Sequence, residues 1–169
     1  MCKSARVPLL TMGAAIAALL ATAPVSAAVG PHAKICEAGQ AAALVRVSGF
    51  KVPRGIVSVK LYPSNSRFLE KRAYIRKVEV PVTGSSPMDV CVPVPSSGRY
   101  AVAVRHEVGA DKSRSDGGGF SGNPKVSLFD VMLKRKPDLN AVSFNVNGST
   151  RIVPITLLYL QGTTLRPAA

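Results

Sequence analysis

Residues 88–105 read MDVCVPVPSSGRYAVAVR, and this stretch decides the fold class. Apolar residues occupy every second position from Met88 to Val94 and again from Tyr100 to Val104. Successive side chains of a β-strand point to opposite faces, so this alternation predicts two strands, each with one buried face. The Pro-Ser-Ser-Gly sequence at 95–98 is typical of the turn that joins two strands.

The same alternation recurs on both sides of this stretch. The further runs are 45–47, 57–61, 78–82, 142–146 and 153–159. Turn-forming residues separate the runs, and Asn147-Gly148 is a strong hairpin signal. Seven short strands predict an all-β domain built as a seven-stranded β-sandwich or a barrel. Pro81, Pro93 and Pro154 have no N–H for a strand ladder, so their strands are predicted to be sheet edges or bulged.

A long irregular stretch, 107–139, interrupts the strand pattern. It is rich in Gly and Pro, and only Ser127 to Leu133 is predicted to form a helical turn. Gly117, Gly119 and Gly122 match the spacing of a dinucleotide-binding motif, which requires a tight strand-to-helix turn. No helical pattern follows them, so no nucleotide site and no other cofactor is predicted. A loop of this length is usually functional or mobile.

The first 27 residues have the order of a cleavable signal peptide. Lys3 and Arg6 precede an uncharged run from Val7 to Ala23, and Val25-Ser26-Ala27 offers small residues for cleavage after Ala27 or Ala28. An uncleaved anchor is the alternative, but the run is short for a span of about 20 residues. A lipoprotein is disfavoured because Cys2 precedes the apolar run and Cys36 lacks preceding small apolar residues. We predict a periplasmic or extracellular protein with no transmembrane span in the mature chain.

The predicted organisation is a signal peptide at 1–27, an N-terminal segment at 28–41 and a sandwich domain at 42–161. Two cysteines, Cys36 and Cys91, remain after the signal, which predicts one disulfide in an oxidising compartment. Cys91 lies on the outward-facing parity of its strand, so the disulfide would tie the N-terminal segment to the outside of a sheet. The chain-entropy model gives such a cross-link roughly 3–4 kcal/mol.

Charge and aromatic content restrict the partners. Without residues 1–27 the chain carries 20 Lys and Arg against 9 Asp and Glu, a net charge of +11. Such a charge attracts anionic components of the cell envelope, and solubility is the alternative explanation. The chain has no Trp, four Tyr and five Phe, which is few for a carbohydrate-stacking face. Nucleic acid is not expected as a partner outside the cytoplasm.

No catalytic residues are predicted, and His106 is the one candidate. It could be combined with Asp111 or Asp116 and a nearby serine, but the spacing does not favour a triad, and a single His at a strand end is more often structural. Glu107, Asp111 and Asp116 are hard oxygen donors that suit Ca²⁺. Lys112 and Arg114 stand among them and would repel a dication, so no metal site is predicted. A hydrolase and a Ca²⁺-stabilised module stay open as alternatives.

Three segments resemble a family of small exported bacterial proteins catalogued as a domain of unknown function. These segments are GRYAVAVRHE at 98–107, GFSGN at 119–123 and SLFDV at 127–131. The resemblance spans about residues 43–160 and implies a transthyretin-like, Greek-key β-sandwich and export, but no activity. Members carry an acidic, Asn-rich loop where this chain has Glu107 and Gly109, so metal binding there would be lost or weakened. The sequence therefore predicts an exported binding or structural module of the cell envelope.

Overall fold

The computed structural model describes residues 27–84, 86–109 and 116–168, and strands dominate them. The strands are β1 (Ala28–Val29), β2 (Ala42–Ser48), β3 (Ile56–Pro63), β4 (Arg76–Pro81), β5 (Met88–Pro93), β6 (Gly98–Glu107), β7 (Gly117–Phe120), β8 (Ser143–Val146), β9 (Arg151–Thr156), β10 (Leu158–Gln161) and β11 (Thr164–Pro167). The helices are α1 (Ala33–Glu37), α2 (Leu128–Met132) and α3 (Leu139–Val142). The predicted signal peptide lies outside the described residues, apart from Ala27. No helix in the described part of the chain is long and apolar enough to cross a membrane.

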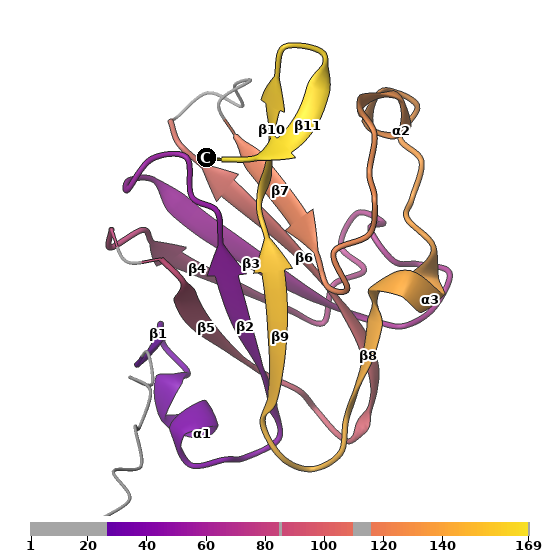
Figure 1. Cartoon of the computed structure of the whole chain (residues 1–169). Helices are drawn as coiled ribbons and strands as arrows, with labels where there is room; N and C mark the ends of the chain where they lie inside the picture. Colours follow the sequence, from indigo (N-terminus) through magenta and orange to yellow (C-terminus); the bar gives the residue numbers. More distant parts are fainter. Residues whose placement is uncertain (1–26, 85, 110–115, 169) are drawn as a thin grey trace, which may run out of the picture.

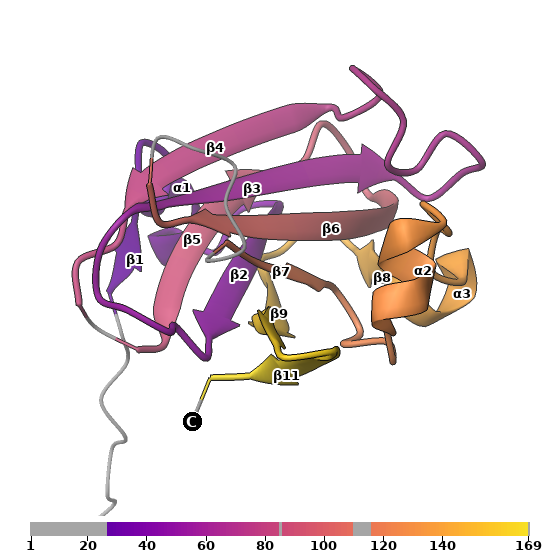
Figure 2. The ribbon, with the colours of Figure 1, turned by 90° about the horizontal axis from the view of Figure 1, so that it is seen from above.

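Two sheets form the molecule (Figure 1). The smaller has the strand order β1-β5-β2-β9, and the larger has the order β11-β10-β7-β6-β3-β4, with β8 also paired to β6. Seen from above, β3, β4 and β6 run side by side, while β2 and β5 cross beneath them (Figure 2). The main core lies between the sheets, with Val45 and Val90 contributed by the smaller one and Val59 and Val102 by the larger one. The predicted all-β class and two-sheet packing are thus observed.

The described residues form eleven strands rather than the predicted seven. One difference is the run 153–159, which was predicted as a single strand. It forms β9 in the smaller sheet and β10 in the larger sheet, and the chain passes between them at Leu157. Alternation continues through this change of sheet because Val153, Ile155, Leu157 and Tyr159 all face the same core. Another difference is β7, which forms inside the stretch predicted as a loop.

The prolines of β4 and β9 lie where the sequence predicts them. β4 and β9 are the terminal strands of their sheets, so Pro81 and Pro154 can leave a ladder position without a donor. Pro93 ends β5 and is paired only with Ala42 of β2, because β1 reaches no further along β5 than Val90. The predicted edge positions are therefore confirmed for β4 and β9, whereas β5 lies between β1 and β2 and only its end at Pro93 has a free side.

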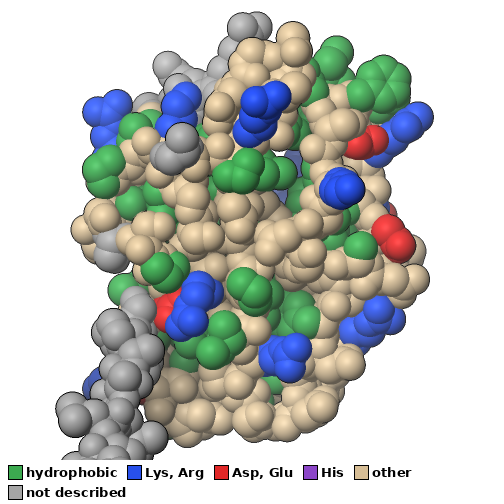
Figure 3. Space-filling view, viewed as in Figure 1, with side chains coloured by type: hydrophobic (Ala, Val, Ile, Leu, Met, Phe, Trp, Pro, Cys, Tyr) green, Lys and Arg blue, Asp and Glu red, His purple; other side chains and the backbone are tan. Residues whose placement is uncertain are grey.

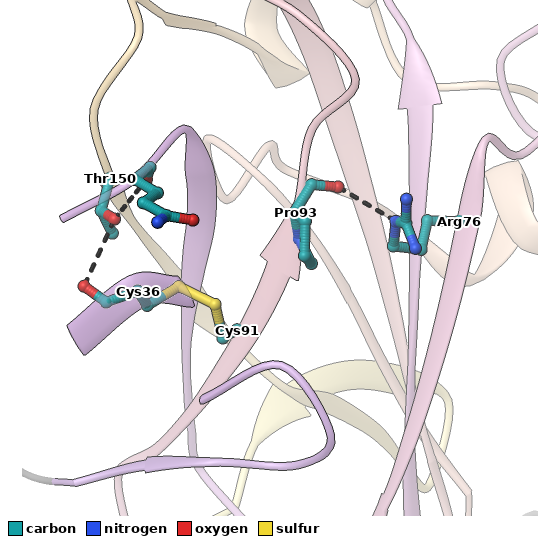
Figure 4. The surroundings of a disulfide bond; sticks show 6 residues. Cys36, Arg76, Cys91, Pro93 and Thr150 are labelled. Carbon is teal, nitrogen blue, oxygen red and sulfur yellow. Dashed lines mark hydrogen bonds between the residues drawn. A yellow bond between two sulfur atoms is a disulfide. The ribbon is translucent and has the colours of Figure 1, made fainter. Parts of the chain in front are cut away.

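The predicted Cys36–Cys91 disulfide is present and joins α1 to the outer face of β5 (Figure 4). Cys36 and Cys91 form a separate small cluster with Ala42, apart from the main core. The hydroxyl of Thr150 donates to the backbone carbonyls of Gln40, at 2.7 Å, and Cys36, at 3.4 Å. The disulfide and Thr150 together hold the N-terminal segment against the smaller sheet.

Candidate functional site

An apolar groove lies on the outer face of the larger sheet, between the β10–β11 hairpin and the chain that carries α2. Figure 3 shows this face hollowed between the two. Leu158 and Leu160 flank Tyr159, whose side chain is in the core, so the leucines project outward into the groove. The groove has a volume of about 690 Å³. It is open to solvent and within the range usual for small-molecule sites.

Aliphatic side chains form both walls of the groove. Val126, Leu128 and Val131 line one side, and Leu158, Leu160 and Leu165 line the other. Phe120 is the only aromatic residue among the lining residues. The walls therefore fit an aliphatic ligand better than a sugar or a base, which are held by stacked aromatic rings.

Three successive glycines of β7 set the depth of the groove. A Cβ atom on Gly117 would lie 2.5 Å from the Tyr159 ring, and one on Gly119 would lie 2.7 Å from the Ile155 side chain. Gly117 is therefore required for close packing against the Tyr159 ring of the neighbouring strand β10, and Gly119 for close packing against β9 of the smaller sheet. Gly118 faces the opposite way, into the groove, where a Cβ atom would meet only the carbonyl of Val104 at 3.7 Å. The missing side chain at Gly118 leaves the floor of the groove open.

Asn123 fixes the start of the wall that carries α2. Its side-chain oxygen accepts a hydrogen bond from the N–H of Thr156 at 2.8 Å, and its amide nitrogen donates to the carbonyl of Pro154 at 3.2 Å. These two bonds replace a strand partner along the free edge of β9. Gly122, with φ of +75°, makes the turn that brings Asn123 to this edge, and a side chain there would collide with the Ala141 carbonyl.

The short helix α2 is held by its cap rather than by burial, since none of its residues is buried. The Ser127 hydroxyl accepts from the N–H of Asp130, and the Asp130 carboxylate accepts from the N–H of Ser127 at 3.0 Å. Together these bonds form a capping box. Hydrogen bonds from the Ser127 side chain and backbone lower the pKa of Asp130, so the cap is fully formed at neutral pH.

One cation, Lys125, lines the groove. The one carboxylate that lines it, Asp116, is already paired. Lys125 lines the groove and also a second hollow of about 410 Å³, which Lys134, Arg135 and Lys136 border. Asp116 lies at the groove too, but Arg105 binds one of its oxygens at 2.6 Å and the N–H of Val108 binds the other at 3.1 Å. The groove therefore presents an apolar trough with positive charge at its rim.

His106 lies in the core, away from the groove. Its side chain is fully buried, its Nε2 is 2.7 Å from the carbonyl of Arg54, and its Nδ1 is 2.6 Å from the Tyr159 hydroxyl. A carbonyl only accepts, so Nε2 donates to Arg54, and Nδ1 shares a hydrogen bond with the Tyr159 hydroxyl. Burial raises the pKa of the Tyr159 hydroxyl, which keeps it a donor. Both ring nitrogens thus have internal partners.

Two of the candidate metal ligands, Glu107 and Asp116, lie around an arginine side chain rather than around an open site. Arg105 binds Asp116 and also approaches Glu107 at 3.7 Å, so a cation lies between these two carboxylates. Asp111 falls outside the described residues. Among the residues that the structure describes, no group of three or more His, Cys, Asp or Glu side chains is placed to hold a metal ion.

Sequence reasoning missed the groove because its residues come from segments that were treated separately. The alternation of Leu158, Leu160 and the later Leu165 around the Gln161-Gly162 turn is a readable hairpin signal. The glycines of β7 gave no strand signal, since Gly is depleted in strands. The predicted helical turn at 127–133 is confirmed as α2, which forms part of one wall.

Comparison with known proteins places the chain in a family. The model of a family described as an uncharacterized protein conserved in bacteria, DUF2141, matches residues 45–153. The chain belongs to this family. The match includes β7 and α2, while the β10–β11 hairpin and Cys36 lie outside it. No curated protein and no solved structure matches the chain, so the transthyretin-like relationship stays a prediction.

Proposed function

We propose that this protein is an exported binding module of the cell envelope that holds an anionic amphiphile, with the alkyl chain in the groove. The observation that carries the proposal is the open aliphatic trough of about 690 Å³ over Gly118. A soluble domain gains stability by covering such a surface, and a concave apolar site with few polar groups is the usual form of a small-molecule site.

The charge at the rim selects the head group. Lys125 is exposed and lines the groove, and no carboxylate among the described residues pairs with it. The +11 net charge of the chain beyond residue 27 adds a general attraction for anions. Asp116 does not oppose an anionic head group strongly, because Arg105 neutralises it. A carboxylate or phosphate on an alkyl chain therefore satisfies both the trough and its rim.

A binding role is favoured over catalysis by the position of His106. Both of its nitrogens are used inside the core, and the groove is lined by no nucleophile beside a base. Catalysis by a general base requires a ring nitrogen within reach of a substrate proton. The hydrolase alternative would need the core to open around His106, and the Ca²⁺ alternative would need Arg105 to leave Glu107 and Asp116.

Export is the part of the proposal that rests on the first 27 residues and on the disulfide. Disulfides persist in oxidising compartments. When the full chain is produced in a bacterium with its own leader, we expect intact-mass measurement of the periplasmic or secreted protein to show a chain that begins at Ala28 or Val29. An uncleaved chain retained in the membrane fraction would contradict export by a cleaved signal.

Filling the groove should weaken ligand binding without harming the fold. Gly118→Leu places a side chain over the floor, where the backbone leaves room for a Cβ atom. We expect dansylated undecanoic acid, a fluorescent fatty acid, to bind the wild-type protein and to be displaced by decanoate. The Gly118→Leu variant should bind it at least about tenfold more weakly, which equals roughly 1.4 kcal/mol.

Two controls make this binding test specific. Gly118→Ala adds only one methyl group and should keep most of the affinity. Nonyltrimethylammonium has the same alkyl chain as decanoate with a positive head group, so it should compete poorly if the basic rim selects anions. Equal affinity of the Gly118→Leu and wild-type proteins, at unchanged thermal stability, would refute the groove as the site.

A further inference from the structure

The apolar side chains at the tip of α2 are largely exposed, and most of them lie outside both the core and the groove. Phe129, Val131, Met132 and Leu133 expose 60%, 53%, 71% and 50% of their surface, and only Val131 also lines the groove. Four large apolar residues within five consecutive positions form a contiguous exposed patch, which we call the α2 tip. A patch of this kind with a polar rim marks an interaction surface.

Basic residues surround the α2 tip. Lys125 precedes it, and Lys134, Arg135 and Lys136 follow it directly. The carboxylates in the same segment are those of Asp130 and Asp138. Asp130 is held in the capping box, and Asp138 accepts from the N–H of Asn140 to cap α3. Lys136 is 3.3 Å from Glu70, and Arg135 is 3.9 Å from Asp130 and 5.5 Å from the Phe129 ring centroid. The rim of the patch is therefore positive.

We propose that the α2 tip docks onto an anionic lipid bilayer, with Phe129, Met132 and Leu133 entering the headgroup boundary. Apolar insertion and attraction of Lys and Arg to anionic headgroups act together in proteins that bind a membrane surface. This proposal goes beyond ligand binding in the groove and does not depend on it, because these three side chains do not line the groove.

The shape of the segment favours a bilayer over a protein partner. The chain from 124 to 137 forms an arch that stands apart from the strands, with α2 at its far end (Figure 1). A projecting tip can reach a flat surface without a complementary pocket. The side chains of the tip also follow the order of a membrane boundary. Apolar residues lie at the end, and cations lie directly behind them.

Vesicle flotation tests the proposal. We expect the wild-type protein, in its disulfide-bonded form without the leader, to bind vesicles of phosphatidylcholine mixed with phosphatidylglycerol and to bind pure phosphatidylcholine much more weakly. Phe129→Asp with Met132→Asp should reduce the partition coefficient on the mixed vesicles by about tenfold or more. Replacing Lys134, Arg135 and Lys136 with Gln should reduce binding to mixed vesicles and leave binding to pure phosphatidylcholine unchanged.

A matched control separates the α2 tip from general charge and stickiness. Ile152, at the start of β9, is 49% exposed and lies outside the arch, so Ile152→Asp should leave vesicle binding unchanged. The Gly118→Leu variant should also float with the vesicles as the wild type does, which keeps this test distinct from that of the groove. Binding that is equal in the wild-type and α2-tip variants would overturn the proposal. Failure of the wild type to bind mixed vesicles would also overturn it and would favour a protein partner.

Discussion

Removing the Cys36–Cys91 disulfide should lower the free energy of unfolding by roughly 3–4 kcal/mol. The two cysteines are 55 residues apart, and a cross-link that closes a loop of this length removes a large part of the conformational entropy of the unfolded chain. The measurement is chemical denaturation of the oxidised wild type beside Cys36→Ala with Cys91→Ala. Alanine is the replacement of choice because Cys91 is fully buried in an apolar cluster.

In this variant, we also expect α1 to open locally before the whole domain unfolds. α1 has only one buried residue, Cys36, and no side-chain cap, so the disulfide is its main attachment beside the Thr150 hydrogen bond. Hydrogen exchange at 33–37 should accelerate in the variant, while β3 and β6 keep their protection. Thr150→Val is the matched control, since it removes only the hydrogen bonds to Cys36 and Gln40 and should cost about 1 kcal/mol. A loss below that value on removal of the disulfide would contradict its structural role.

His106→Ala should destabilise the protein by about 3 kcal/mol. The substitution leaves a cavity in the core, removes the partner of the Arg54 carbonyl and leaves the Tyr159 hydroxyl with only the N–H of Lys51. It also removes the edge contact with Phe50, whose ring centroid is 5.3 Å from that of the imidazole. Thermal or denaturant unfolding of the variant measures the effect directly.

Tyr159→Phe is the control for this prediction. It removes the hydroxyl but keeps the ring that packs against Gly117, so we expect a smaller loss of about 1 kcal/mol. Under the structural role, ligand binding in the groove should persist in both variants at temperatures where they are folded. A His106→Ala variant as stable as the wild type would show that His106 is not needed for the fold and would reopen a chemical role.

The strands and the disulfide could be predicted because each leaves a local signal. Alternation at 57–61 or 88–94 follows from one buried face, and the outward parity of Cys91 correctly placed the disulfide outside the sheet. The strand count could not be predicted from alternation alone. Leu157 carries the chain from one sheet to the other without a break in parity, since both sheets face one core.

The groove was beyond the sequence for a different reason. Its floor depends on Gly118, which has no side chain and so contributes nothing to an alternation of apolar and polar residues. It also depends on Gly117 and Gly119, where contacts with Tyr159 and Ile155 leave no room for a side chain. These contacts join β7 to residues more than thirty positions later in the chain. Leu165 of the opposite wall lies on β11, beyond the last predicted strand. His106 could be recognised as a candidate, but its burial became visible only when Tyr159 and Arg54 were placed beside it.

The most direct test of the groove is a map of amide chemical shifts during titration with decanoate. We expect the largest changes at Gly118, Leu158 and Leu165, with smaller changes along α1 and β4, and we expect Gly118→Leu to remove them. Shifts that concentrate elsewhere, or that persist unchanged in Gly118→Leu, would contradict the assignment of the groove as a binding site.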